Sequence, residues 1–163
     1  MNEGGPNHSR RAVIRVFGAT AVGASFTGCL GSPTENSRET RHPDETYVEE
    51  SPDYGEWFDD VENYRGTVDG RGQNEIIVRV GAGNRGMAFD PAAVMISPST
   101  SIIWEWTGDG GTHNVAAESN EFESEYSNSS GHTYEYTFED SGVFKYVCEP
   151  HRSAGMKGAI VVD

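Results

Sequence analysis

The sequence predicts an all-β fold, a Greek-key β-sandwich of about seven or eight strands. From Asn74 onward, short runs alternate apolar and polar residues with a period of two, which is typical of half-buried strands. Glycine, proline, serine and asparagine separate these runs, as turn residues do. No stretch has the length and spacing of a helix.

The expected strands follow one another along the second half of the chain. They cover residues 75–80, 93–97, 101–107, 113–117, 133–138, 143–148 and 157–162. In the run 143–148, Phe144, Tyr146 and Cys148 share a face, because side chains two positions apart point the same way. We therefore expect Cys148 to emerge at the end of a strand, at the rim of the core.

The N-terminal part of the chain predicts an export signal followed by a tether. Residues 1–28 have a charged start, a short apolar middle and small residues at the end, which favours a signal over a permanent membrane span. Residues 29–60 are acidic and poor in aliphatic side chains, so we expect a flexible tether. The folded domain is predicted for 61–163. Aromatic residues near the end of the tether are able to dock on it, namely Tyr54, Trp57, Phe58 and Tyr64.

The charge of the chain excludes one class of partner. Its 26 acidic and 12 basic residues give a formal net charge of -14, which would repel a phosphate backbone, so nucleic acid is not an expected partner. The acidic residues extend well beyond the tether, as Glu118, Glu135 and Asp140 illustrate. This favours adaptation to high salt, where charge repulsion is screened, over an ordinary domain with an acidic linker.

Four side chains predict a metal site. Cys148, His151 and Met156 offer a thiol, an imidazole and a thioether within one short loop, and His113 follows a glycine-rich turn upstream. Thiolate and thioether suit Cu(I), imidazole also suits Cu(II), and two His, one Cys and a weak axial Met form a blue-copper electron-transfer site. We therefore expect one type 1 copper per chain. With Cys29 and Cys148 as the only cysteines, core packing and the metal are expected to stabilise the domain, without a disulfide.

These residues resemble the cupredoxin family. The stretch from Cys148 to Met156 is similar to the ligand loop of plastocyanins and halocyanins, and the resemblance covers roughly 74–163. It implies that Asn114 ties the two ligand loops together and that Pro150, which lacks an N–H, raises the reduction potential at the sulfur. It also implies that electrons leave through His151. Redox partners would dock there transiently, on a patch that includes Val115, Ala154 and Gly155.

Two short motifs in the signal add an expectation about location. Arg10-Arg11 resembles a twin-arginine signal, and the segment that ends at Cys29 resembles a lipobox. The resemblance implies a lipid on Cys29 that anchors the exported protein to the outer face of the cell membrane. The alternative is an apolar tail with a chance cysteine.

The sequence therefore predicts a monomeric electron carrier between membrane redox proteins, and no enzyme. A copper oxidase or nitrite reductase requires further histidine clusters, whereas we interpret His8, His42 and His132 as non-ligands. The alternative function is a surface lipoprotein that stores or delivers copper. Asn128 begins a short match to an N-glycosylation acceptor.

Overall fold

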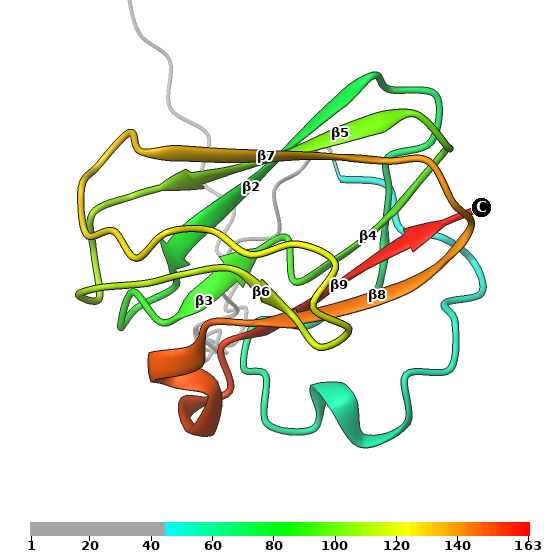
Figure 1. Cartoon of the computed structure of the whole chain (residues 1–163). Coiled ribbons are helices and arrows are strands. Elements are labelled where there is room, and N and C mark those ends of the chain that lie inside the picture. Colours follow the sequence, from blue (N-terminus) through cyan, green and yellow to red (C-terminus); the bar gives the residue numbers. More distant parts are fainter. Residues whose placement is uncertain (1–44) are drawn as a thin grey trace, which may run out of the picture. The chain divides into compact units, whose positions relative to one another are not determined.

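A computed structural model of the protein describes residues 45–163 and contains two β-sheets that pack face to face (Figure 1). The first sheet has the order β1-β4-β9-β8-β6 and the second the order β3-β2-β5-β7. The strands of the first sheet are β1 (Val68–Asp69), β4 (Ala93–Ile96), β6 (Ala116–Ala117), β8 (Gly142–Val147) and β9 (Lys157–Val162). Those of the second are β2 (Glu75–Ala82), β3 (Ala88–Asp90), β5 (Thr100–Trp106) and β7 (Thr133–Phe138). The predicted all-β sandwich is confirmed.

The strands agree with the expected runs except where pairing is short or irregular. β7 and β9 have the predicted bounds, whereas β6 is much shorter than 113–117. There the chain pairs with a loop: His113 forms an isolated bridge with Ser127, and the Ser124 hydroxyl accepts the N–H of Val115. Strands β1 and β3 were not predicted, because two or three residues are too few to show a period.

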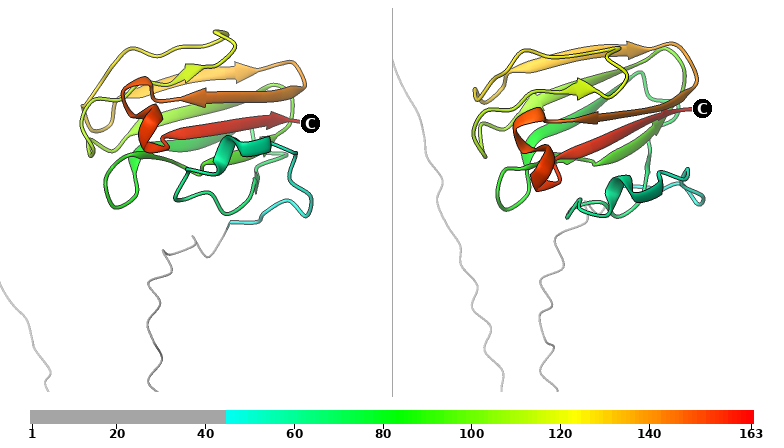
Figure 2. Two further views of the ribbon diagram at one scale, coloured as in Figure 1. Left: turned by 90° about the horizontal axis from the view of Figure 1, so that it is seen from below. Right: turned by 60° about the horizontal axis from the view of Figure 1, so that its bottom comes forward.

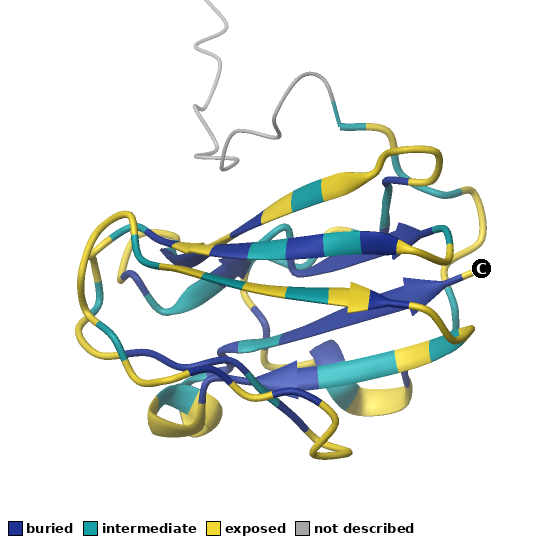
Figure 3. Cartoon of the chain, turned by 45° about the horizontal axis from the view of Figure 1, so that its top comes forward, coloured by how far each residue is buried: buried dark blue, intermediate teal, exposed yellow. Residues whose placement is uncertain are grey.

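The main core lies between the sheets. Burial alternates along β5 (Figure 3). The inward side chains of both sheets form one cluster. The cluster includes Tyr146, Cys148 and Met156, with Phe144 packed against it, as the predicted shared face requires. The large side chains Trp104 and Trp106 belong to this cluster and are almost fully buried.

A segment before β1 covers the outer face of the first sheet. We call residues 45–64 the strap; it contains the 3₁₀ helix η1 (Gly55–Phe58) and lies along β9 (Figure 2). Tyr54, Phe58 and Val61 pack on alanine, methionine and valine side chains of β4 and β9. Every residue of β4 is consequently buried, so the period of two disappears from its exposure.

The predicted start of the domain, residue 61, is wrong, because the strap is already packed on the sheet. Residues 45–60 were expected to belong to the flexible tether, yet Tyr54 and Phe58 are buried and the backbone N–H of Val48 donates a hydrogen bond to Thr67 O at 2.9 Å. The packed region thus begins before residue 61, because burial of these aromatic rings offsets the entropy of ordering the segment.

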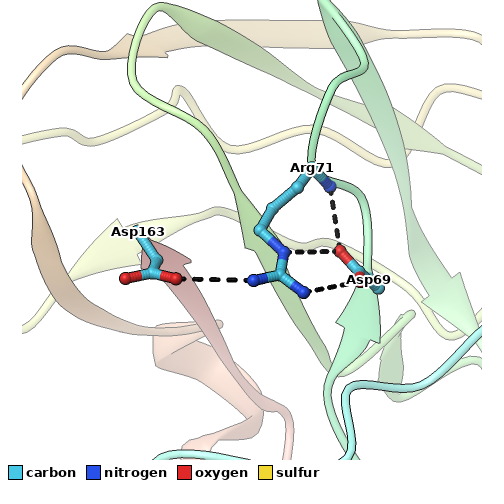
Figure 4. Close-up of polar contacts among 3 residues, drawn as sticks. All are labelled: Asp69, Arg71 and Asp163. Atoms are coloured by element: carbon cyan, nitrogen blue, oxygen red, sulfur yellow. Dashed lines mark hydrogen bonds and ion pairs between the residues drawn. The ribbon is translucent and has the colours of Figure 1, made fainter.

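A charged cluster connects the turn after β1 to the end of β9. Arg71 donates two hydrogen bonds to the Asp69 carboxylate, at 2.9 and 2.8 Å, and approaches Asp163 at 3.5 Å (Figure 4). These hydrogen bonds lower the pKa of Asp69 to about 2. All three side chains are partly exposed, so we expect the cluster to add little to stability.

Within residues 45–163, no helix has the length and apolarity needed to cross a bilayer. The predicted signal, Cys29 and the first part of the predicted tether lie outside the described residues.

Candidate metal centre

One loop between β8 and β9 carries three of the predicted ligands. β8 ends at Val147, Cys148 follows it, and the short helix η2 (Glu149–Ala154) presents His151. Gly155 then takes the left-handed conformation, with a φ of 82°, and reverses the chain. Backbone hydrogen bonds from Cys148 N to Met156 O (3.0 Å) and from Met156 N to His151 O (3.2 Å) close the loop. The three residues are therefore held together by their own backbone.

The fourth predicted ligand, His113, comes from the chain before β6. Its Nε2 lies 2.8 Å from the backbone oxygen of Asp109. Because a carbonyl only accepts, Nε2 carries the proton and Nδ1 presents a lone pair. Trp106 donates its indole N–H to the backbone oxygen of His113 at 3.3 Å. Gly81 lies close by, and a Cβ there would meet Asp109 O at 2.6 Å, so a glycine is required at this position.

Three donor atoms converge on one point. Cys148 Sγ lies 3.6 Å from His113 Nδ1 and 3.4 Å from His151 Nδ1, and the two nitrogens are 3.1 Å apart. Donors bound about 2.0–2.3 Å from one ion in a trigonal plane are about 3.5 Å apart. The spacing therefore fits a single metal ion. The lone pair on His113 Nδ1 faces a second ring nitrogen and a sulfur. A cation between these three atoms would therefore stabilise the arrangement.

Met156 completes the donor set expected for copper. The residue has no exposed surface and belongs to the same core cluster as Cys148. A thioether is a soft, weak ligand, and together with two imidazoles and a thiolate it fits copper better than the harder divalent ions. Among residues 45–163, His113, Cys148 and His151 are the only group of at least three His, Cys, Asp or Glu residues that could hold a metal ion.

Burial disfavours the charged forms of Cys148 and His113 before a metal binds. It raises the pKa of the Cys148 thiol, which the backbone N–H groups of Asn114 and His151 lower in part. Burial also lowers the pKa of His113. Both shifts disfavour charge in a site that lacks a cation, so a bound cation must displace the thiol proton.

Asn114 connects the two ligand loops, as the resemblance implied. Its side-chain amide donates to Glu149 Oε2 at 2.8 Å, and its side-chain oxygen accepts the backbone N–H of Glu149 at 2.9 Å. The Tyr126 hydroxyl donates to the same carboxylate. The hydrogen bonds that this carboxylate accepts from Tyr126 and Asn114 lower the pKa of Glu149. Sequence reasoning missed both partners: the position of Glu149 beside Cys148 was a usable signal, whereas nothing in the sequence marks Tyr126.

The predicted docking patch requires a correction. Val115 is fully buried in the core cluster, and Gly155 is buried with Asp60 O against it, so neither contributes a surface. Ala154 and His151 retain partial exposure, and Pro150 is exposed in the first turn of η2. The side chain of His132 packs edge-on against Trp106, with 4.8 Å between ring centroids, and is outside the ligand group.

Known proteins resemble the chain over the same region and beyond it. Residues 76–163 match the family described as copper binding proteins, plastocyanin/azurin family. The chain is 43% identical to halocyanin from Natronomonas pharaonis, over 95% of this chain and 98% of that protein. It is 32% identical to plastocyanin from Scenedesmus fuscus, over 55% of this chain and 100% of that protein. A solved Cu-containing nitrite reductase from Thermus scotoductus SA-01 aligns with 22% identity and a TM-score of 0.45, over 55% of this chain and 22% of that chain.

Proposed function

The chain belongs to the plastocyanin/azurin family of copper-binding proteins, and from this premise we propose that it carries single electrons. His113, Cys148, His151 and Met156 would hold one type 1 copper, which supplies the Cu(II)/Cu(I) couple when bound. The observation that carries the proposal is the convergence of one sulfur and two ring nitrogens to within 3.6 Å of one another, in loops that adjoin the strands β6, β8 and β9.

Rigidity of the ligands supports electron transfer over substrate chemistry. An electron carrier must change little between its two oxidation states, because any rearrangement adds to the barrier. The Nε2–H of His113 is held by Asp109, the loop of Cys148 is closed on Met156, and Asn114 joins both loops. Such support from neighbouring hydrogen bonds holds ligands in one geometry.

Differences in exposure support His151 as the point where electrons leave. Cys148 and Met156 have no exposed surface and His113 is 1% exposed, whereas His151 is partly exposed. A redox partner that contacts this end of the sandwich would touch His151 before any other ligand. We propose that partners dock there transiently, through a small interface.

The membrane setting is part of the same proposal. The similarity to halocyanin extends over 95% of the chain and thus includes part of the N-terminal region, whose motifs predict export and a lipid on Cys29. We propose an exported monomer that is anchored at the outer face of the cell membrane and exchanges electrons with membrane redox proteins. Mass spectrometry of Cys29 peptides from the membrane fraction tests the anchor: an unmodified thiol would contradict it.

A spectroscopic and redox titration tests the function. Addition of Cu(II) to the purified protein should produce an intense blue colour that saturates at one copper per chain, with reversible one-electron reduction. Cys148→Ser should remove the colour and leave a folded sandwich, as judged by circular dichroism. A colourless copper complex of the wild-type protein would refute the proposal. Rapid loss of copper to a chelator, without electron exchange, would favour the storage or delivery function instead.

A further inference from the structure

The strap touches the copper loop on both sides of Met156. The Asp60 carboxylate accepts hydrogen bonds from Lys157 Nζ at 2.6 and 2.9 Å, and Lys157 directly follows Met156. The backbone oxygen of Asp60 lies against Gly155, which directly precedes Met156: a Cβ at this glycine would be 2.0 Å from that oxygen. A single residue of the strap is therefore in contact with both neighbours of the axial ligand.

The only two lysines of the chain fasten the strap to the sheet. Lys145 Nζ and Lys157 Nζ lie 5.3 and 5.4 Å from the centre of the Trp57 ring, within the range of cation–π attraction. Lys145 also donates to the backbone oxygen of Tyr54 at 3.0 Å, and Trp57 donates its indole N–H to Gly158 O at 3.1 Å. The strap is thus attached to β8 and β9 at several points, and its attachment at Lys157 adjoins the copper loop.

Part of this attachment is shielded from solvent. The Lys157 side chain is 16% exposed and the Asp60 side chain 49%. An ion pair with one partly buried member and two short hydrogen bonds is less screened than a pair in open solvent. The geometry of this ion pair therefore allows it to restrain the copper loop.

We propose that the strap positions the axial ligand of the copper site, with Asp60 and Lys157 as positioning residues. The proposal rests on the proposed type 1 copper site and adds the element that holds Met156 in it. A bond from copper to the Met156 thioether would be weak, so the protein would fix the position of this sulfur more than the metal would. The backbone of β8 and β9 holds the loop from one side, and Asp60 closes the other.

Three single variants separate positioning from stability and from charge. Lys157→Gln and Asp60→Asn each remove the ion pair, but they change the local charge in opposite directions. Lys145→Gln is the matched control, because Lys145 also contacts Trp57 and the strap but adjoins no ligand. Each copper-loaded variant is measured by visible absorption, by EPR of Cu(II), by its reduction potential and by the rate of copper loss to a chelator. Its unfolding in urea is measured as well.

Positioning predicts that Lys157→Gln and Asp60→Asn change the absorption and EPR spectra in the same direction. Loss of a partly exposed pair worth about 0.5–1 kcal/mol corresponds to copper loss about two- to fivefold faster. Lys145→Gln should lower stability and leave the spectra unchanged. Wild-type spectra in all three variants would mean that the strap only stabilises the fold. Reduction potentials that shift in opposite directions in Lys157→Gln and Asp60→Asn, with unchanged spectra, would mean a charge effect. Either result overturns the proposal.

A spectral change in Lys145→Gln equal to that in Lys157→Gln would also overturn it, since the effect would then not originate at the copper loop. Failure of the proposed function has a different signature. In that case the wild-type protein itself would form no blue copper complex.

Discussion

The contact between Gly155 and the strap gives a sharp test of the structure. Gly155→Ala adds one methyl group where φ is 82° and where Asp60 O would be only 2.0 Å away. Gly72→Ala is the matched control, because Gly72 has almost the same φ, 79°, and nothing lies within 4 Å of its added Cβ. Both variants force alanine into the left-handed region, but only one of them collides with another segment.

The expected losses of stability follow from the left-handed backbone and from the collision with Asp60 O. The left-handed conformation costs a non-glycine residue about 1–2 kcal/mol, and we expect Gly72→Ala to lose about that much stability. Asp60 O must move by about 1 Å or more to accept the new methyl in Gly155→Ala, and overpacking of this kind costs about 1–3 kcal/mol further. The expected total for Gly155→Ala is therefore about 2–5 kcal/mol.

Urea unfolding of both variants, with copper bound and without it, measures the difference. We expect Gly155→Ala to be the less stable variant in both forms and to show an altered Cu(II) spectrum, because the displaced strap borders Met156. Equal losses of stability in the two variants, with unchanged spectra, would refute the close packing of the strap against the copper loop.

Three further predictions follow from other contacts. Asn114→Ala should lower the free energy of unfolding by about 2–3 kcal/mol and speed copper loss, because it removes two hydrogen bonds of a fully buried side chain that joins both ligand loops. The control Tyr126→Phe should change little. Equal rates of copper loss to a chelator in the two variants would contradict this role of Asn114. Burial raises the pKa of Tyr54 to about 12, so its folded form favours the protonated hydroxyl; this contribution is complete below pH 10 and is lost as the pH rises through 12. Tyr54→Phe should flatten that alkaline decline in unfolding experiments, and an unchanged decline would assign it to other groups. The net charge of -14 should make thermal stability rise with KCl concentration well beyond 0.15 M, and a flat response would speak against salt adaptation.

The sequence alone determined most of the strand pattern and the candidate ligand set. β7 and β9 were predicted with their observed bounds, because the alternation of side chains along a strand is visible in consecutive residues of the sequence. Cys148, His151 and Met156 were identifiable because ligand chemistry depends on residue type and these three share one loop. His113 was accessible to the same reasoning, since a glycine-rich turn precedes it.

Only the tertiary structure decided what supports that site. Asp60 and Lys157 are 97 residues apart in sequence, and no local pattern marks either of them as a neighbour of the copper loop. The same holds for the burial of Val115 and for the contact of Tyr126 with Glu149. Periodicity and spacing record the interactions of a residue with its near neighbours along the chain. Contacts between distant segments arise when the sheets and the strap pack, and they become visible only in the folded molecule.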